Sequence, residues 1–216
     1  MQTTDQLPVG SPTNGTPDSL NETARKILEA AKTIVARDGY SALTLRAINR
    51  EAGVSNMGAA GYYFGSKAHV VAAIIRQAIA DYSRVSFPTV SADASLEQRV
   101  NAFTESLGEY DNDSLAFFEI LPHALRDEAL RTYLVDEYLT YFQACVKYFF
   151  PNETLEESER QRLECLAQDV AAFQDGVILQ AQILGERYDL RSAYGRLGRY
   201  LLTAAREAVI PAEMAE

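Results

Sequence analysis

The stretch from Thr44 to Lys67, which reads TLRAINREAGVSNMGAAGYYFGSK, decides the fold of the amino-terminal part of this 216-residue chain. Its first half predicts a short helix from about Leu45 to Ala52, which Thr44 can cap. The apolar spacing places Leu45, Ile48 and Ala52 on the buried face of this helix.

A tight turn and a second short helix follow. Gly53 supplies the left-handed backbone conformation that side chains resist, and Val54 is expected to fill the angle between the two helices. The second helix is expected within residues 55–63, with Ser55 or Asn56 as its cap. Two short helices joined in this way form a helix-turn-helix, whose second helix can present its exposed face to the major groove of DNA.

The flanking sequence is helical as well. Asn21 and Gly39 bound a first helix over residues 22–38, and Ser66 can cap a longer helix with a regular apolar stripe. Further helices are expected near 95–110, 112–121, 126–150, 155–184 and 190–209, and no segment alternates as a strand would. The sequence therefore predicts an all-α fold of about nine helices.

The composition divides the chain into three parts. Residues 1–20 are rich in Pro, Gly, Ser and Thr and have almost nothing to bury, which is typical of a disordered tail. We expect a helix-turn-helix domain over residues 21–67 and a helical body over residues 68–216. Residues 21–80 carry eight Lys or Arg and four Asp or Glu, whereas residues 81–216 carry twelve and twenty-four. A basic head on an acidic body fits local DNA binding despite the net charge of −10.

The head resembles the DNA-binding signature of the TetR (tetracycline-repressor-like) family over about Arg25–Ile75. The resemblance lies in the helix RKILEAAKTIVARDGY (Arg25–Tyr40), the Thr44-led helix, Ala52-Gly53-Val54-Ser55, and the closing YYFGSK (Tyr62–Lys67). This sequence departs from the commonest pattern at three points. Eleven steps instead of ten separate Gly53 from Phe64, Tyr63 stands where histidine is usual, and Asn49 stands where alanine is usual.

The resemblance implies a set of DNA-contacting residues. Thr44 and Arg46 match positions used on the DNA backbone or in the groove, and Tyr62, Tyr63 and Lys67 match positions that meet phosphates. The positions where the recognition helix faces bases are Ser55, Asn56, Met57 and Ala59. Phe64, Ile27 and Ile48 are expected in the core.

The resemblance also implies a small-molecule effector site in the body. Aromatic residues concentrate in two of its predicted helices, as an aromatic-lined cavity would require, but aromatics at helical spacing also form ordinary cores. His123 and Arg126 could anchor a polar end of the effector, or could simply lie on a surface loop. The candidate effector-binding residues are Phe117, Phe118, His123, Tyr138, Tyr141, Phe142 and Phe173.

The apolar stripes of the last two predicted helices indicate how the chain forms a dimer. Leu163, Leu166, Val170, Phe173, Val177, Ala181 and Leu184 form one apolar stripe, and Tyr194, Leu197, Leu201, Ala204 and Ala208 form another. Such stripes can build a four-helix bundle across a two-fold axis, or they can pack within the chain's own core. We expect a homodimer through residues 155–184 and 190–209.

These observations predict a ligand-responsive transcriptional regulator, most often a repressor, that binds a palindromic operator as a homodimer. The alternative is a dimeric ligand-binding protein whose head no longer binds DNA. An enzyme is disfavoured, since neither His69 nor His123 sits in a metal-ligand or nucleophile pattern, and no metal or cofactor is expected. With no membrane segment, no secretory signal and two cysteines expected to be buried thiols, we expect a cytoplasmic location.

Overall fold

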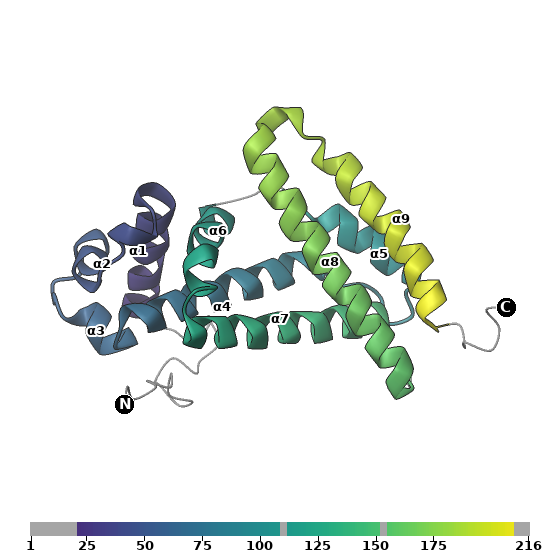
Figure 1. Cartoon of the computed structure of the whole chain (residues 1–216), viewed down its shortest axis with the longest axis horizontal. Coiled ribbons are helices and arrows are strands. Elements are labelled where there is room, and N and C mark those ends of the chain that lie inside the picture. Colours follow the sequence, from purple (N-terminus) through teal and green to yellow (C-terminus); the bar gives the residue numbers. More distant parts are fainter. Residues whose placement is uncertain (1–20, 109–111, 152–154, 210–216) are drawn as a thin grey trace. The chain divides into compact units, whose positions relative to one another are not determined.

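The computed structural model describes residues 21–108, 112–151 and 155–209, and all regular structure in these ranges is helical (Figure 1). This confirms the predicted all-α class. The elements are α1 (Glu22–Asp38), η2 (Tyr40–Ala42), α2 (Leu45–Glu51), α3 (Ala59–Phe64), α4 (Lys67–Ser86), α5 (Leu96–Ser106), α6 (Asn112–Ala124), α7 (Glu128–Phe149), α8 (Glu157–Leu184), η3 (Gly185–Arg187) and α9 (Leu190–Val209).

The predicted caps account for the start and end of the first helix. The Asn21 side chain accepts a hydrogen bond from the Ala24 amide at 2.9 Å. Gly39 ends α1 at φ 80°, a conformation that side chains rarely adopt. The bounds of α1 and of α9 agree with the prediction, while the α6 helix runs three residues further than expected and includes Pro122 in its last turn.

The described residues divide by their contacts into two compact units, each taken here by itself. Unit 1 comprises Met1–Ala80 and Tyr110–Glu137, and unit 2 comprises Asp81–Glu109 and Tyr138–Glu216, so that α4 and α7 each contribute to both. The predicted boundary between Lys67 and Ala68 separates a DNA-binding domain from a helical body. These are functional domains and not compact units, so the boundary stays a prediction. The predicted tail, residues 1–20, lies outside the described residues.

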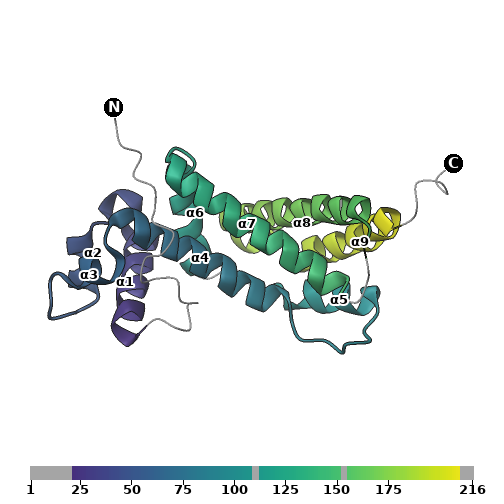
Figure 2. The same ribbon diagram turned by 90° about the horizontal axis from the view of Figure 1, so that it is seen from below.

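Unit 1 is built around α1. This helix packs against α2, α3 and α6 (Figures 1 and 2). The apolar stripe on its inner face is buried. Ile27, Ile48 and Phe64 are all buried, as predicted. The α6 helix, which the sequence assigned to the body, therefore packs on the first helix of the head.

Unit 2 is built around α8 and α9, which lie side by side (Figure 2), while α5 packs against α9. Gly198 makes the approach of α9 to α5 possible, because a Cβ atom there would lie 3.2 Å from Thr104 Cγ2 and 3.6 Å from Val100 Cγ1. Buried Arg99 joins three segments of this unit. Its guanidinium donates to the carbonyls of Ser91, Ala92 and Ala94 at 3.1 Å and of Tyr148 at 3.3 Å.

The two predicted apolar stripes face the core of their own chain for most of their length. The buried members are Leu163, Leu166, Val170, Val177, Ala181, Tyr194, Leu197, Leu201 and Ala208. Phe173 and Ala204 are half-buried, and Leu184 is exposed. The alternative of internal packing therefore holds for these residues, and a second copy would have to use another face of α8 and α9.

The cysteines differ in their surroundings. Cys145 is buried, and burial raises the pKa of its thiol to about 12. Cys165 is exposed on α8, so the prediction that both thiols are buried is wrong for Cys165. It lies between Leu163 and Leu166 of the buried stripe, on the side of the helix that faces away from the core. Over the ranges that the structure describes, no helix is long and apolar enough to cross a membrane.

Candidate nucleic-acid interface

The turn of the helix-turn-helix has the conformation that the sequence predicts. Gly53 adopts φ 62°, and its amide donates to the carbonyl of Arg50 at 3.3 Å after the last turn of α2. Ile48 is fully buried, while Leu45, Ala52 and Val54 are half-buried. The buried anchor of α2 and the left-handed glycine therefore fix the direction of the chain toward α3.

The segment between the turn and α3 is longer than predicted. The α3 helix begins only at Ala59, and Gly58 at its cap position offers no side chain. Asn56 instead accepts a hydrogen bond from the Gly58 amide at 2.9 Å, which forms a turn ahead of the helix. Ser55, Asn56 and Met57 thus lie in an exposed loop rather than in a helix.

Most of the predicted DNA-contacting side chains are exposed, but Ala59 is not. Thr44, Arg46 and Tyr62 are exposed, and Tyr63 is half-buried with its ring 5.1 Å from that of Tyr62. Ala59 keeps only 4% of its surface, because it packs inward at the first turn of α3. The prediction that Ala59 faces the bases is therefore wrong, since its side chain has no access to a groove.

Thr44 has two roles that its chemistry allows at once. Its Oγ1 accepts a hydrogen bond from the Ala47 amide at 3.1 Å and so caps α2. The hydroxyl proton remains able to donate to an acceptor outside the protein, such as a phosphate oxygen. The same side chain can therefore cap the helix and contact a DNA backbone.

Lys67 is held by the protein itself. Its Nζ donates to the Tyr40 carbonyl at 3.1 Å and lies 3.8 Å from the centroid of the Tyr40 ring. Burial lowers the pKa of this ammonium group. The ring of His123, in α6, stacks on the Tyr40 ring with 4.0 Å between the centroids. A phosphate contact by Lys67 would have to compete with these interactions.

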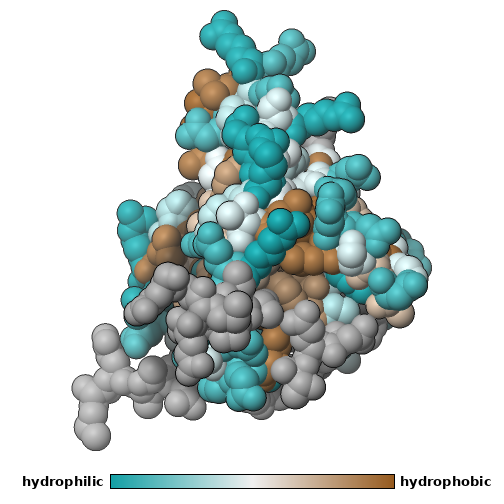
Figure 3. All heavy atoms as spheres, turned by 90° about the vertical axis from the view of Figure 1, so that its right-hand side faces the viewer, coloured by the Kyte–Doolittle hydropathy of each residue, from teal (hydrophilic) through white to brown (hydrophobic). Residues whose placement is uncertain are grey.

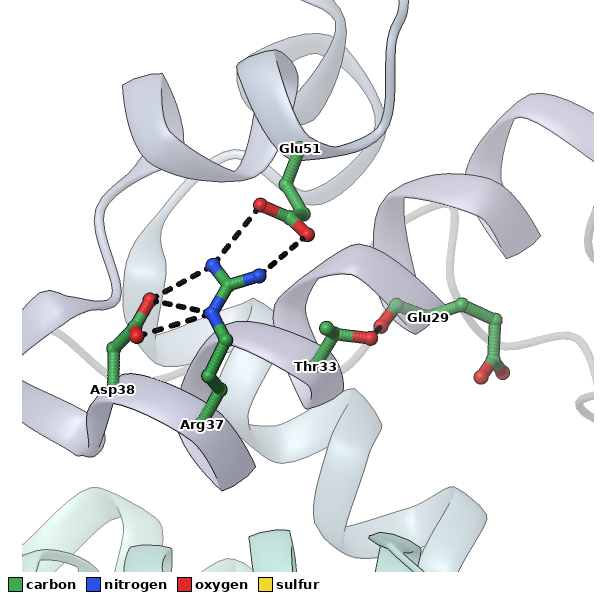
Figure 4. A network of polar contacts seen from close by, with 5 residues as sticks. All are labelled: Glu29, Thr33, Arg37, Asp38 and Glu51. Carbon is green, nitrogen blue, oxygen red and sulfur yellow. Dashed lines mark hydrogen bonds and ion pairs between the residues drawn. The ribbon is translucent and has the colours of Figure 1, made fainter.

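A second cation of the head, Arg37, is neutralised by carboxylates (Figure 4). Its guanidinium makes a bidentate contact with Glu51, with both distances 3.1 Å, and this contact joins the end of α1 to the end of α2. The guanidinium also binds the neighbouring Asp38. These bonds lower the pKa of both carboxyl groups. In the same view Thr33 donates to the Glu29 carbonyl one turn earlier in α1.

The cations that remain exposed on α2 are Arg46 and Arg50. Among the described residues, neither arginine forms an ion pair with a carboxylate. Arg50 was not among the predicted contacts, and its position one turn after Arg46 could have indicated it. Thr44, the exposed face of α2, the loop 55–58 and Tyr62 together form what we call the reading surface.

Comparisons with known proteins agree with this geometry. The model of the family described as bacterial regulatory proteins, tetR family, matches residues 27–74. The matched segment begins in α1 and ends in α4, so it includes the whole helix-turn-helix. Residues 27–74 are therefore identified as a DNA-binding domain of the TetR family.

Solved structures extend the likeness in fold to most of the chain. A member of the family from Streptomyces coelicolor A3 is 24% identical, with a TM-score of 0.63 over 83% of this chain and 98% of the other. Salmonella enterica GusR is 20% identical, with a TM-score of 0.66 over 87% and 98%. The multidrug binding protein EbrR complexed with ethidium is 24% identical, with a TM-score of 0.59 over 82% and 98%. A search among curated proteins gave no significant match.

The predicted effector residues do not fall in one compact unit. Phe117, Phe118 and His123 belong to α6 in unit 1, where Phe117 is buried and His123 stacks on Tyr40. The others, Tyr138, Tyr141, Phe142 and Phe173, belong to unit 2. Arg126 is exposed and donates to the Pro122 carbonyl at 3.0 Å. A single cavity lined by all seven residues stays a prediction.

Unit 2 contains a buried polar cluster that the sequence did not reveal. The Tyr141 hydroxyl donates to Gln174 Oε1 at 2.5 Å, and the Tyr138 hydroxyl donates to Asp175 at 2.9 Å. Gln174 Nε2 is buried and has no hydrogen-bond partner among the described residues. Burial raises the pKa of Asp175, which the tyrosine bond only partly offsets. Buried polar groups with unmet hydrogen bonds are uncommon in protein interiors and mark candidate ligand contacts.

Proposed function

We propose that this TetR-family protein is a ligand-responsive repressor that binds a palindromic DNA operator as a homodimer. The observation that carries the proposal is the reading surface. It combines two exposed arginines, a capping threonine able to donate, and an exposed loop over a correctly turned helix-turn-helix. Arginine and hydroxyl groups are ordinary phosphate donors, and the loop side chains can reach base edges.

The exposed side of α8 supports the homodimer. Ile183 and Leu179 are 66% and 45% exposed, and Gly176 lies one turn earlier with open space around it. Figure 3 shows that apolar side chains stay uncovered among hydrophilic ones on one side of the molecule. Six exposed residues follow the alternating four- and three-residue spacing of a helix-packing seam: Cys165, Asp169, Ala172, Gly176, Leu179 and Ile183. We propose that a second copy covers this seam.

The polar cluster of unit 2 supports the response to a ligand. A small molecule with an acceptor for Gln174 Nε2 would satisfy an unmet donor, and several rings surround Tyr141, with Phe87 5.5 Å and Tyr82 6.2 Å away. The related fold of EbrR, a multidrug binding protein crystallised with ethidium, is in keeping with an aromatic effector. An effector that prefers a conformation unsuited to DNA would release the operator by shifting the population.

The test of DNA binding is a fluorescence-polarisation titration with the DNA that flanks the protein's own gene, against scrambled DNA, at several salt concentrations. We expect tighter binding to the flanking DNA, two chains per site and an affinity that falls steeply with salt. If the protein does not prefer the flanking DNA, its operator lies elsewhere. Selection of bound sequences from a random DNA library should then yield a palindrome. A library that yields none would contradict the proposal and favour a dimer whose head no longer binds DNA.

The test of the seam is a pair of variants, Ile183→Glu on the seam and Val135→Glu on α7, where Val135 is 52% exposed. We expect the first to sediment as a monomer and the second as a dimer, because only the first places a charge in the dimer interface. The Cys165 thiol should react with maleimide more slowly in the wild type than in Ile183→Glu, with buried Cys145 as the internal reference. A dimer that persists in Ile183→Glu with equally reactive Cys165 would place the interface elsewhere.

A further inference from the structure

Asn49 is a buried polar residue in the middle of the helix-turn-helix. It keeps only 2% of its surface and lies on α2, where its neighbour Ile48 is fully buried. A buried amide side chain is costly unless its hydrogen bonds are satisfied. Asparagine at such a site therefore requires an explanation beyond packing.

The Asn49 side chain makes one hydrogen bond to the loop before α3 and one to α3 itself. Its Nδ2 donates to the Met57 carbonyl at 2.6 Å, and its Oδ1 accepts from the Ala60 amide at 2.8 Å. Met57 lies within the exposed loop, and Ala60 lies in the first turn of α3. One side chain of α2 thus binds a carbonyl of the loop before α3 and an amide in the first turn of α3.

These bonds replace the cap that α3 lacks. The first amides of a helix have no acceptor within the helix, and Gly58 provides no side chain to serve them. The α3 helix has only six residues, so it has few internal bonds with which to fix its own start. The position of α3 relative to α2 therefore depends on a residue of α2.

We propose that Asn49 is a positioning residue that sets the register of the reading loop, and through it the sequence specificity of DNA binding. The inference rests on the proposed function, because specificity has meaning only if the head binds DNA. Asn49 itself is buried and does not contact DNA. Its loss should leave the exposed arginines and Thr44 in place while the loop and the start of α3 shift or fluctuate. Specific binding should then fall while backbone binding persists.

The experiment compares the wild type with Asn49→Ala and Asn49→Asp, and uses Asn101→Ala on the exposed face of α5 as a matched control. Polarisation titrations measure affinity for the operator and for scrambled DNA. For Asn49→Ala we expect about a tenfold loss in the ratio of the two affinities, the size of effect that one or two buried hydrogen bonds produce. Affinity for scrambled DNA and its salt dependence should stay within about twofold of the wild type.

The Asp variant tests whether the bond to Met57 matters by itself. It keeps an acceptor for the Ala60 amide but places a carboxylate oxygen against the Met57 carbonyl oxygen, with no proton between them. We therefore expect its specificity ratio to fall at least as far as that of Asn49→Ala. Equal loss of operator and scrambled binding in Asn49→Ala, or an unchanged ratio, would overturn the proposal.

Hydrogen exchange tests the clamp in the absence of DNA. In the wild type, the Ala60 amide should exchange at least about tenfold more slowly than in Asn49→Ala, while amides of α9 exchange alike in both. An Ala60 amide equally protected in both proteins would overturn the proposal even if DNA binding is confirmed. If the Ala60 amide exchanges slowly in the wild type but the wild type prefers no DNA sequence, Asn49 still positions α3. In that case the proposed DNA-binding function is wrong.

Discussion

The head and unit 2 are specified in different ways. The conformation of the head depends on single residues at fixed places: a left-handed glycine, a capping threonine and a buried asparagine amide, each with a local bond. Unit 2 depends on long apolar stripes and on buried polar groups contributed by helices far apart in the sequence. A change in the head should therefore alter DNA recognition with little loss of stability, and a change in the core of unit 2 should do the opposite.

The substitution Arg99→Ala should have the largest effect, and it tests whether buried polar groups stabilise unit 2. The change removes a buried guanidinium and leaves several carbonyls of the loop and α7 unsatisfied. We expect the free energy of unfolding to fall by about 3 kcal/mol, as measured by chemical denaturation. Arg191→Ala, at an exposed arginine at the start of α9, should change it by less than about 0.5 kcal/mol. Equal stability of the two variants would contradict the role of Arg99.

Arg46→Ala tests the other half of the comparison. Arg46 is exposed on α2, so its removal should leave the free energy of unfolding nearly unchanged. We expect affinity for both operator and scrambled DNA to fall by about tenfold, and the slope of log affinity against log salt to decrease by about one. Arg191→Ala is again the matched control and should bind like the wild type. Loss of affinity in Arg191→Ala instead would move the DNA contact to the body.

Asp175→Asn sharpens the comparison with a smaller effect. Because burial raises the folded-state pKa of Asp175 above its unfolded-state value, the ionised group destabilises the native state. This penalty is fully present above the folded-state pKa and disappears as the pH falls below the unfolded-state value. At pH 7 the variant should be more stable than the wild type by less than about 1 kcal/mol, and the difference should vanish below about pH 3. A variant that loses stability at pH 7 would show that the bond from Tyr138 outweighs burial.

Sequence reasoning succeeded where the signal was local. The capping groups Asn21 and Thr44 and the glycines Gly39 and Gly53 act on their own neighbours, so the bounds of α1 and the turn of the helix-turn-helix could be predicted. The start of α3 could not be predicted in the same way. The Ala60 amide is satisfied by Asn49, eleven residues earlier, and this bond appears only once α2 and α3 are packed together.

The same limit applies to the candidate site. A short helix placed one turn too early put Ala59 on the wrong face. The contact of Lys67 with Tyr40 joins residues far apart in sequence and could not be predicted, while the phosphate contact of Lys67 stays a prediction. In unit 2 the apolar stripes predicted helices correctly, but periodicity alone does not say which partner a stripe meets. The buried position of Gln174 could not be predicted, because a single polar residue on the apolar face of a helix has no sequence pattern of its own.

The most direct test of the central claim, that the loop 55–58 faces DNA, is site-specific crosslinking. A photoreactive side chain replaces Met57, which is 56% exposed, and in a parallel protein it replaces Tyr200 of α9, which is 44% exposed. Both proteins are irradiated on end-labelled operator DNA, and the crosslinked bases are mapped. The account predicts crosslinks from position 57 within the two half-sites of a palindrome, and none above background from position 200. Crosslinks from position 200 alone would contradict it.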